Sequence, residues 1–212
     1  MANIKPWLEA HNFNEVKKEK IFELEVNNHR IEIDIEREKI SYPNLKEIGR
    51  ETTTNFSSEE NFVVLDIIIG LLKQGYLPNQ ISIEKGYKLG HNTKSGNADV
   101  TIEDNEGNPF LIIEAKTYGL EFQKEWRNTL NDGGQLFSYE KQENKAHALV
   151  LYSSRVNELS IERIYHAIHL QDNDEFLATL DNPKSYKNAK GGMINFMYGE
   201  MYISKTSELM VF

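Results

Sequence analysis

The chain has 212 residues, of which 39% are hydrophobic and 27% are charged, so it is long enough for one globular domain and short for two. It contains no cysteine, which excludes a disulfide scaffold, a thiolate zinc site, an iron–sulfur cluster and a cysteine nucleophile, and which predicts a reducing, cytoplasmic compartment. A net charge of -9 argues against a protein that grips nucleic acid through phosphates over its whole surface.

The first predicted elements are a hairpin and a buried helix. Apolar and polar residues alternate from Phe22 to Val26 and from Ile31 to Ile35, on either side of Asn27-Asn28, which is hairpin spacing. The segment from Ser57 to Gly75 has apolar residues at helical intervals. It begins with serines that can cap a helix and ends at a glycine that can stop one. We expect a largely buried helix there.

Three strand-like runs follow the helix. They extend from Gln80 to Lys85, from Ala98 to Glu103 and from Pro109 to Ala115, and the last two flank a turn at Asp104 to Gly107. Short strands joined in this way predict an antiparallel meander.

The rest of the chain predicts helices, a strand and a closing hairpin. A polar helix from Leu120 to Glu143, broken at Gly133-Gly134, precedes the apolar run from Ala146 to Tyr152. A further helix is predicted from Glu158 to His169, and a closing hairpin turns at Gly199-Glu200. This alternation predicts one compact domain of the mixed α/β class.

Three charged residues are predicted to converge at one end of the meander. Asp99 opens one strand and Glu114-Ala115-Lys116 closes its neighbour, and across such a hairpin positions 99 and 114 lie close to opposite each other. Glu114 and Lys116 share a face because strand side chains alternate. Apolar residues adjoin these charges, where an unpaired carboxylate would be expensive.

Two neighbouring carboxylates repel each other, and a hard divalent cation between them resolves the conflict. Oxygen ligands without histidine or cysteine favour Mg²⁺ or Mn²⁺ over zinc. Such an ion polarises a phosphodiester and lowers the pKa of a bound water, while an adjacent lysine positions that water or stabilises the transition state. The pattern therefore favours hydrolytic phosphodiester cleavage, with a solvated salt pair as the alternative interpretation.

These residues resemble the PD-(D/E)xK nuclease superfamily, and more specifically the amino-terminal nuclease domain of type I restriction enzyme R subunits. The resemblance covers about residues 57–153. Gly96-Asn97-Ala98-Asp99 is similar to the first metal-ligand strand of that family, with Ala98 in place of the proline that gives the family its name. Glu114-Ala115-Lys116 matches the ExK triplet, and Gln135-Leu136-Phe137-Ser138-Tyr139 is similar to the QxxxY motif.

The resemblance implies a restriction-endonuclease-like core, in which a central mixed β-sheet is flanked by helices. It makes 1–212 a single nuclease domain with an N-terminal hairpin and extension (1–56), a nuclease core (57–153) and a C-terminal helix and strands (154–212). It also implies that Asp99 and Glu114 ligate Mg²⁺ or Mn²⁺ and that Lys116 is catalytic.

A third metal ligand is implied from the opening helix. Glu60 is the candidate and Glu59 the alternative. Ser57 and Glu60 also have capping-box spacing, in which the two side chains satisfy backbone donors at a helix start, and this alone would explain Glu60.

Further residues are candidates for supporting the site or contacting DNA. Gln135 and Tyr139 lie four residues apart, so in a helix they would share one face. They would either flank the cleft or form a pair with Tyr139 packed on the sheet and Gln135 exposed. Three lysines before Asp99 would contact phosphate or simply be solvated: Lys85, Lys88 and Lys94.

The predicted function is a metal-dependent DNA endonuclease domain of a type I-like restriction-modification system. Cleavage would not be sequence-specific, and targeting would come from a translocase or from methylation and specificity subunits. Gly90 to Gly96 spans a P-loop-like interval but lacks the Lys and Ser/Thr of a P-loop, so no nucleotide site is predicted. The resemblance implies that a helicase motor, or alternatively a methyltransferase, would follow this domain in a longer protein. The apolar end, Leu209 to Phe212, predicts a docked strand or a cut inside a longer protein.

Two other interpretations stay open. One is a nuclease-like fold kept as a catalytically silent DNA-binding or assembly module, which would have no affinity for divalent metals. The other is a standalone nuclease of phage defence or repair. No membrane association is expected, because no apolar run approaches the roughly 20 residues that a bilayer requires.

Overall fold

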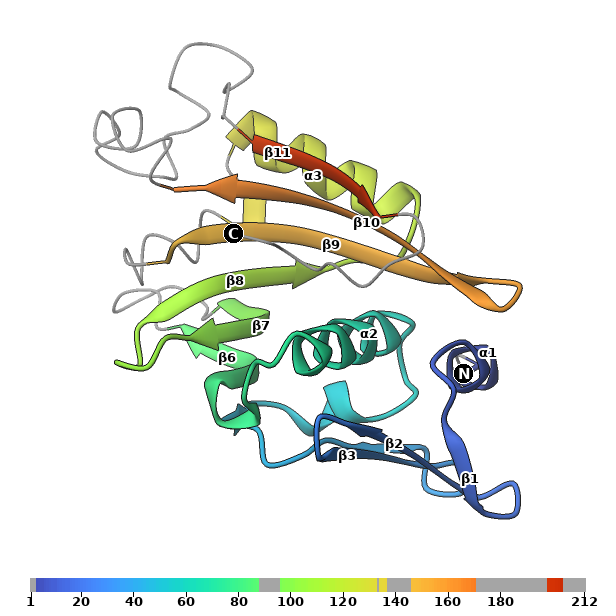
Figure 1. The fold of residues 1–212 in the computed structure, drawn as a ribbon. Coiled ribbons are helices and arrows are strands. Elements are labelled where there is room, and N and C mark those ends of the chain that lie inside the picture. The colour runs from blue at the N-terminus through green and yellow to red at the C-terminus, as the bar shows by residue number, and fades with distance from the viewer. Residues whose placement is uncertain (1–2, 88–95, 133, 137–145, 171–197, 204–212) are drawn as a thin grey trace.

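The computed structural model describes residues 3–87, 96–132, 134–136, 146–170 and 198–203, which form two β-sheets and three α-helices (Figure 1). The small sheet is antiparallel, with the strand order β1-β2-β3-β4. Its strands are β1 (Asn14–Lys17), β2 (Ile21–Val26), β3 (His29–Asp34) and β4 (Lys39–Ser41).

The large sheet is mixed and has seven described strands in the order β11-β10-β9-β8-β7-β6-β5. These are β5 (Glu47–Ile48), β6 (Ile81–Tyr87), β7 (Gly96–Glu103), β8 (Pro109–Ala115), β9 (Ala148–Asn157), β10 (Ser160–His169) and β11 (Tyr198–Ile203). The helical elements are α1 (Lys5–Ala10), α2 (Glu60–Lys73) and α3 (Leu120–Asp132), with short 3₁₀ turns η1 (Glu51–Thr54) and η2 (Pro78–Gln80). The structure thus confirms the mixed α/β class.

The predicted first hairpin is present, and its turn explains its sequence. Asn27 and Asn28 have φ angles of 47° and 64°, the left-handed conformation that a two-residue type I′ turn requires and that asparagine tolerates. The Asn27 side chain also donates a hydrogen bond of 2.7 Å to the carbonyl oxygen of Leu72, at the end of α2. The small sheet is therefore tied to the central helix.

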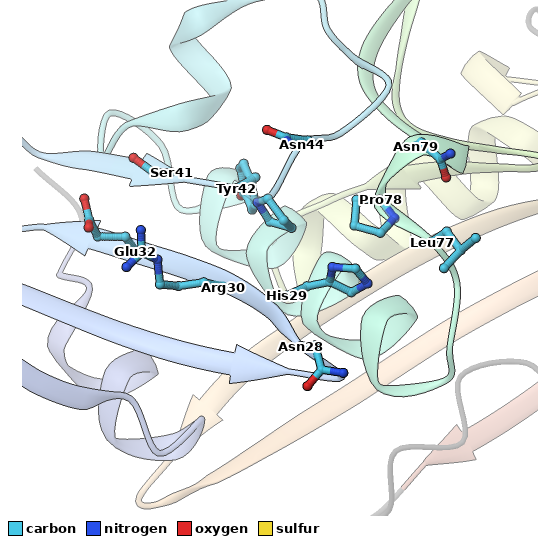
Figure 2. A pocket seen from close by; sticks show the side chains of 11 residues that line it. Asn28, His29, Arg30, Glu32, Ser41, Tyr42, Asn44, Leu77, Pro78 and Asn79 are labelled. Atoms are coloured by element: carbon cyan, nitrogen blue, oxygen red, sulfur yellow. The ribbon is translucent and has the colours of Figure 1, made fainter.

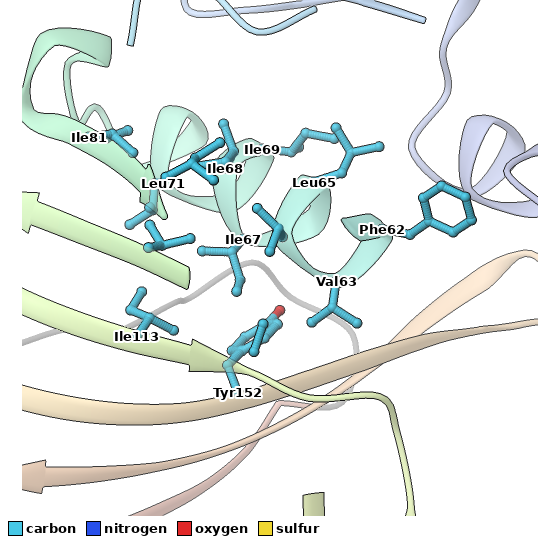
Figure 3. Close-up of a cluster of buried hydrophobic side chains, with 14 of the residues drawn as sticks. Phe62, Val63, Leu65, Ile67, Ile68, Ile69, Leu71, Ile81, Ile113 and Tyr152 are labelled. Atoms are coloured by element: carbon cyan, nitrogen blue, oxygen red, sulfur yellow. The ribbon is translucent and has the colours of Figure 1, made fainter. Parts of the chain in front are cut away.

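Helix α2 lies between the two sheets and supplies much of the core (Figure 1). Every residue from Asn61 to Leu72 is buried, which fits a helix that is apolar on all sides and confirms the expected buried helix. Val63 and Ile67 point toward Tyr152 of the large sheet, whereas Ile68 and Ile69 point away from it (Figure 3). Among the described helices, none is both long and apolar enough to cross a membrane.

The centre of the large sheet has the predicted meander. Strands β6, β7 and β8 pair antiparallel, and β9 then pairs parallel to β8 after the crossover that contains α3. Helix α2 packs on one face of the sheet and α3 on the other, since the two hydrophobic clusters take alternate side chains from β8 and β9. Helix α3 ends at Asp132, residues 134–136 of its predicted continuation are again helical, and residues 137–143 lie outside the described residues.

The predicted helix from Glu158 to His169 is wrong: this segment forms strand β10, paired with β9 along its whole length. Glu158 has a φ of 56° and lies in the turn that reverses the chain. Ile164 and Ile168 pack on the α3 side of the sheet, while Tyr165 and Ala167 pack on the α2 side. Burial on both faces removes the alternation of a half-buried strand and leaves a spacing that resembles a helix.

The predicted turn at Gly199-Glu200 is also wrong. Both residues lie inside strand β11, where Gly199 pairs with Ala167 and Glu200 with His166. Glycine was interpreted as a turn signal, but the neighbouring strand provides pairing partners throughout. The predicted first arm of the hairpin spans 194–198; Tyr198 belongs to β11, and 194–197 lie outside the described residues.

A carboxylate is buried in the core between α2 and β10. Asp66 accepts hydrogen bonds from Arg163 at 2.6 and 3.1 Å and from the Tyr152 hydroxyl at 2.7 Å, and His11 Nε2 lies 3.3 Å from its Oδ1. Burial alone would raise the pKa of Asp66, but the contacts with His11 and Arg163 outweigh it and hold the pKa well below its usual range. We call these four residues the Asp66 cluster.

Candidate active site

The pairing of β7 with β8 brings the predicted carboxylates together. Val100 pairs with Ile113 in an antiparallel ladder. The residue before Val100, Asp99, therefore lies beside the residue after Ile113, Glu114, at the end of the ladder. The Asp99 carboxylate accepts a hydrogen bond of 2.7 Å from the backbone N–H of Ala115. Glu114 is almost fully buried, with 2% of its surface exposed. The end of this hairpin is therefore where the negative charge gathers.

Lys116 and Glu60 complete the convergence. The Lys116 ammonium donates a hydrogen bond to Glu114 and lies 4.0 Å from the carboxylate of Glu60, the first residue of α2. Glu60 donates its own backbone N–H to the Ser58 hydroxyl at 3.2 Å, and the capping-box contact with Ser57 is not formed. Glu60, and not its predicted alternative Glu59, thus lies beside the lysine.

The electrostatics of this group differ from those of an ordinary surface. Burial raises the pKa of Asp99 well above its usual value, and the charge of Glu114 raises it further, against the opposing effects of Lys116 and the Ala115 N–H. Burial lowers the pKa of Lys116, but the charges of Glu114 and Asp99 outweigh it and leave that pKa above 10.5. Lysine therefore stays protonated while the carboxylates compete for one cation.

A fourth carboxylate, that of Glu84, belongs to the same site and was not predicted from the sequence. The pairs Ile83–Val100 and Lys85–Ala98 set Glu84 beside Asp99 across β6 and β7, and the charge of Glu84 adds to the raised pKa of Asp99. The signal was present: an acidic residue ends an apolar run in the strand next to the one that holds Asp99.

The backbone of Glu84 is strained. Its φ of 53° is unusual for a non-glycine residue inside a strand. The side chain is nonetheless 13% exposed and fixed, since Oε2 accepts a hydrogen bond of 3.1 Å from Asn97 and lies 3.7 Å from Arg50 Nε. Strain of this kind persists only where the surroundings over-determine it, and it concentrates at functional sites. We call Glu60, Glu84, Asp99, Glu114 and Lys116 the carboxylate cluster.

The structure describes only part of the predicted QxxxY pair. Gln135 is exposed, and its backbone N–H donates a hydrogen bond of 3.0 Å to Glu125 of α3. Tyr139 lies outside the described residues. A shared role for the two residues at the cleft therefore stays a prediction.

The structure describes one of the three lysines that were predicted to contact DNA. Lys85 lies within strand β6 and forms an ion pair with the buried Glu103 at 3.3 Å. Lys46 also binds Glu103, so the two lysines share one buried carboxylate. The predicted contact of Lys85 with phosphate stays a prediction. Lys88 and Lys94 lie outside the described residues.

The chemistry of the donors fits a hard divalent cation. Every candidate ligand is a carboxylate, the ligand type that Mg²⁺ and Mn²⁺ prefer, and the carboxylates repel one another in a buried setting. Among the residues that the structure describes, no three acidic or histidine side chains are already gathered at ligand distance. The Lys116 ammonium instead supplies positive charge between Glu114 and Glu60. A cation would bind by drawing these carboxylates inward.

A separate pocket of about 640 Å³ lies between the small sheet and η2. His29 and Arg30 line it from β3, and Leu77 and Pro78 line it from the other side (Figure 2). None of the residues of the carboxylate cluster lines this pocket. The geometry therefore points to the strand ends, and not to this hollow, as the candidate catalytic site.

Comparison with known proteins adds no relative. The chain matches no protein-family model, and no curated protein is significantly similar to it in sequence. The function proposed below rests on the geometry of the described residues and on the motif resemblance.

Proposed function

We propose that this chain carries a metal-dependent DNA endonuclease with a restriction-endonuclease-like core of the PD-(D/E)xK type. The observation that carries the proposal is the convergence of Asp99, Glu114 and Lys116, with Glu60 and Glu84 beside them, at the ends of paired strands. A mixed sheet with α2 on one face and α3 on the other supports the same core.

The residues divide the work of phosphodiester hydrolysis between them. Asp99, Glu114 and Glu84 would hold Mg²⁺ or Mn²⁺, with Glu60 contributing from the start of α2. A bound divalent cation supplies a polarised phosphate and a water of lowered pKa. Lys116, protonated and adjacent, stabilises the negative charge that develops on the phosphate oxygens. The N–H of Ala115 fixes the orientation of Asp99.

The proposal includes a restriction-modification context in the cytoplasm. A net charge of -9 supports it, because repulsion weakens the binding of DNA to the chain alone and a partner component would strengthen that binding. That component would be a translocase or the methylation and specificity subunits, or a helicase motor or methyltransferase fused to the same polypeptide. Cleavage would then be sequence-nonspecific, and targeting would be left to the partner.

Calorimetric titration of Mn²⁺ tests the metal site without any partner. Wild type should bind, and Asp99→Ala should bind about tenfold or more weakly, because a ligand is removed. Asp104→Ala is the matched control, since this exposed aspartate lies on the turn that joins the same two strands. Equal affinity in wild type and Asp99→Ala would refute the assignment of the ion to Asp99.

A plasmid-nicking assay with Mg²⁺ then tests the chemistry. Lys116→Ala should lower the rate by about 10²–10³-fold with the fold intact, as expected for the loss of one charge-stabilising group. Full activity in this variant would contradict the proposal.

One observation favours a catalytically silent nuclease-like module instead. In the described part of the chain the carboxylates are not gathered at ligand distance, and Lys116 already neutralises Glu114. This alternative predicts no Mn²⁺ binding in wild type, with DNA present or absent, and no nicking at any metal concentration.

A further inference from the structure

A pocket of about 430 Å³ lies between α3 and β10, and half of its lining residues carry aromatic rings: Tyr118, Phe122, Trp126 and His166. The Trp126 ring stacks on His166 with centroids 4.3 Å apart and an angle of 27°. Phe122 packs on the same histidine at 5.2 Å. Ile164 completes the apolar lining from the strand. These side chains form a stack on the α3 face of the large sheet. Figure 1 shows α3 running alongside β10.

The rim of the pocket is aromatic and basic. Tyr118 is 36% exposed, and the Arg155 guanidinium lies 4.2 Å from the centre of its ring while it forms an ion pair with Glu162 at 2.6 Å. Arg127 is exposed on α3 and donates a hydrogen bond of 3.3 Å to the carbonyl oxygen of Gln123, which leaves most of its guanidinium at the surface. Arg127 therefore offers a guanidinium to a phosphate beside the pocket that it lines, in a chain with a net charge of -9.

The pocket adjoins the carboxylate cluster along the chain. Tyr118 follows Lys116 by two residues, so their Cα atoms are at most about 7 Å apart. Gly119, with a φ of 100°, turns the chain from the end of β8 into α3, and it lines the pocket. A phosphate at Lys116 and a flat ring in the pocket would thus belong to the same or to adjacent nucleotides.

We propose that this pocket stacks an unpaired base of the DNA strand whose phosphate lies at Lys116. The inference rests on the proposed function and adds a substrate class to it: DNA with single-stranded or frayed nucleotides. Aromatic faces bind bases of any sequence, while Arg127 pairs with the backbone phosphate. A base inside a duplex is stacked on its neighbours and cannot enter, so the pocket selects unpaired nucleotides.

Fluorescence anisotropy in EDTA tests the pocket with a labelled single strand of about 12 thymidines. Wild type should bind this strand more tightly than a duplex of equal length. Tyr118→Ala should weaken binding about 5- to 100-fold, the expected loss of one stacked base. Tyr118 is on the rim, so its removal leaves the core intact. Trp126→Ala should weaken binding at least as much, and thermal unfolding will show whether it folds.

A matched control and a salt series complete the design. Leu120→Ala removes a side chain that is 78% exposed at the start of α3, outside the pocket, and should leave binding unchanged. Arg127→Gln should weaken binding and flatten its dependence on salt, because one phosphate contact is lost.

Unchanged affinity in Tyr118→Ala, or no preference for the single strand in wild type, would overturn the inference. Because no divalent metal is present, these results are independent of the Mn²⁺ titration. If the chain binds the single strand through Tyr118 but binds no Mn²⁺, the proposed nuclease activity is refuted and the base-binding pocket is supported. The reverse pair of results would refute the pocket alone.

Discussion

Two groups of buried charges lie on the same helix and sheet, and they are built in opposite ways. The Asp66 cluster surrounds one carboxylate with the guanidinium of Arg163, a tyrosine hydroxyl and a histidine. The carboxylate cluster places several carboxylates around the single ammonium of Lys116. The pKa of Asp66 is therefore held below its usual range, whereas that of Asp99 is raised well above it.

The difference is the one expected between a structural group of charges and the proposed functional one. A buried charge that is paired and fully hydrogen-bonded contributes to the fold, and removing one partner leaves the other uncompensated. A group of like charges is tolerated by the fold at a cost, and such groups occur where binding or catalysis needs them. Variants in the two clusters should therefore have opposite consequences.

The largest effect on stability is expected from Asp66→Asn. The substitution leaves Arg163 buried without its counter-charge and should lower the free energy of unfolding by about 3–5 kcal/mol at neutral pH. Urea unfolding followed by circular dichroism measures the change. Glu121→Gln is the control: its ion pair with Lys124 is exposed and should contribute less than about 1 kcal/mol. Similar losses in both variants would contradict a special role for the Asp66 cluster.

Acid should remove the contribution of Asp66 to the free energy of unfolding. Because its pKa in the folded protein is lowered from 3.8, its stabilising contribution is complete above that value and is lost as the pH falls toward the folded pKa. The stability gap between wild type and Asp66→Asn should stay constant from neutral pH down to about pH 5 and narrow below pH 4. Unfolding curves at several pH values test this. A gap that widens in acid would show that the sign is wrong.

Gly49→Ala should reach the carboxylate cluster through its backbone. A Cβ at this position would lie 2.1 Å from the carbonyl oxygen of Glu84, so the strand must shift, and we expect a loss of about 1–3 kcal/mol. Mn²⁺ affinity should fall with it, because Glu84 moves. Gly86→Ala is the control, because Gly86 lies in β6 with Glu84 and the nearest contact of its new Cβ, Asn97 Oδ1, is at 3.7 Å. Equal Mn²⁺ affinity in both variants would show that Glu84 is not a ligand of the metal ion.

Asp99→Asn should cost the fold little. An amide oxygen can still accept the hydrogen bond from Ala115, and one of the repelling charges is removed, so stability in EDTA should equal or exceed that of wild type within about 1 kcal/mol. Metal binding should nevertheless be lost. Thermal unfolding and Mn²⁺ calorimetry on the same preparation check both. Marked destabilisation would show that Asp99, like Asp66, mainly stabilises the fold.

The sequence predicted the centre of the molecule well, for physical reasons. The meander and the buried helix α2 have strong periodicity and clear turn residues such as Asn27-Asn28, and a hairpin fixes the register that sets Asp99 beside Glu114. Helix α1 and strand β4, in contrast, were not predicted. Both are short and lack a repeating pattern, so only tertiary packing selects them.

Strand β10 and Glu84 show what a linear pattern leaves out. The residues of β10 are buried on both faces, which erases the alternation, so the choice between helix and strand depends on β9 and β11 on either side. Glu84 lies far from Asp99 along the chain and enters the site only through strand pairing and a left-handed backbone. The acidic residue at the end of the run is visible in the sequence, but the pairing and the backbone conformation that bring it to Asp99 are not. The Asp66 cluster likewise joins His11, which directly follows α1, to residues from α2, β9 and β10.

The smallest expected change in stability, Glu84→Gly, isolates the strain at the cluster. Glycine adopts a φ of 53° without penalty, which should gain about 1 kcal/mol, but it removes the contacts with Asn97 and Arg50 and adds backbone entropy to the unfolded chain. The net change should lie within about 1 kcal/mol of wild type. Mn²⁺ affinity should fall despite the intact fold.

Glu19→Gly provides the reference for this measurement. Glu19 is also a glutamate with a φ of 53°, but it is exposed on the turn between β1 and β2, away from the cluster. Its replacement relieves the same backbone strain without removing a side-chain contact, so the stability difference between the two variants gives the worth of the contacts of Glu84. If both glycine variants bind Mn²⁺ as wild type does, the strain at Glu84 serves the fold of β6 and has no part in holding a cation.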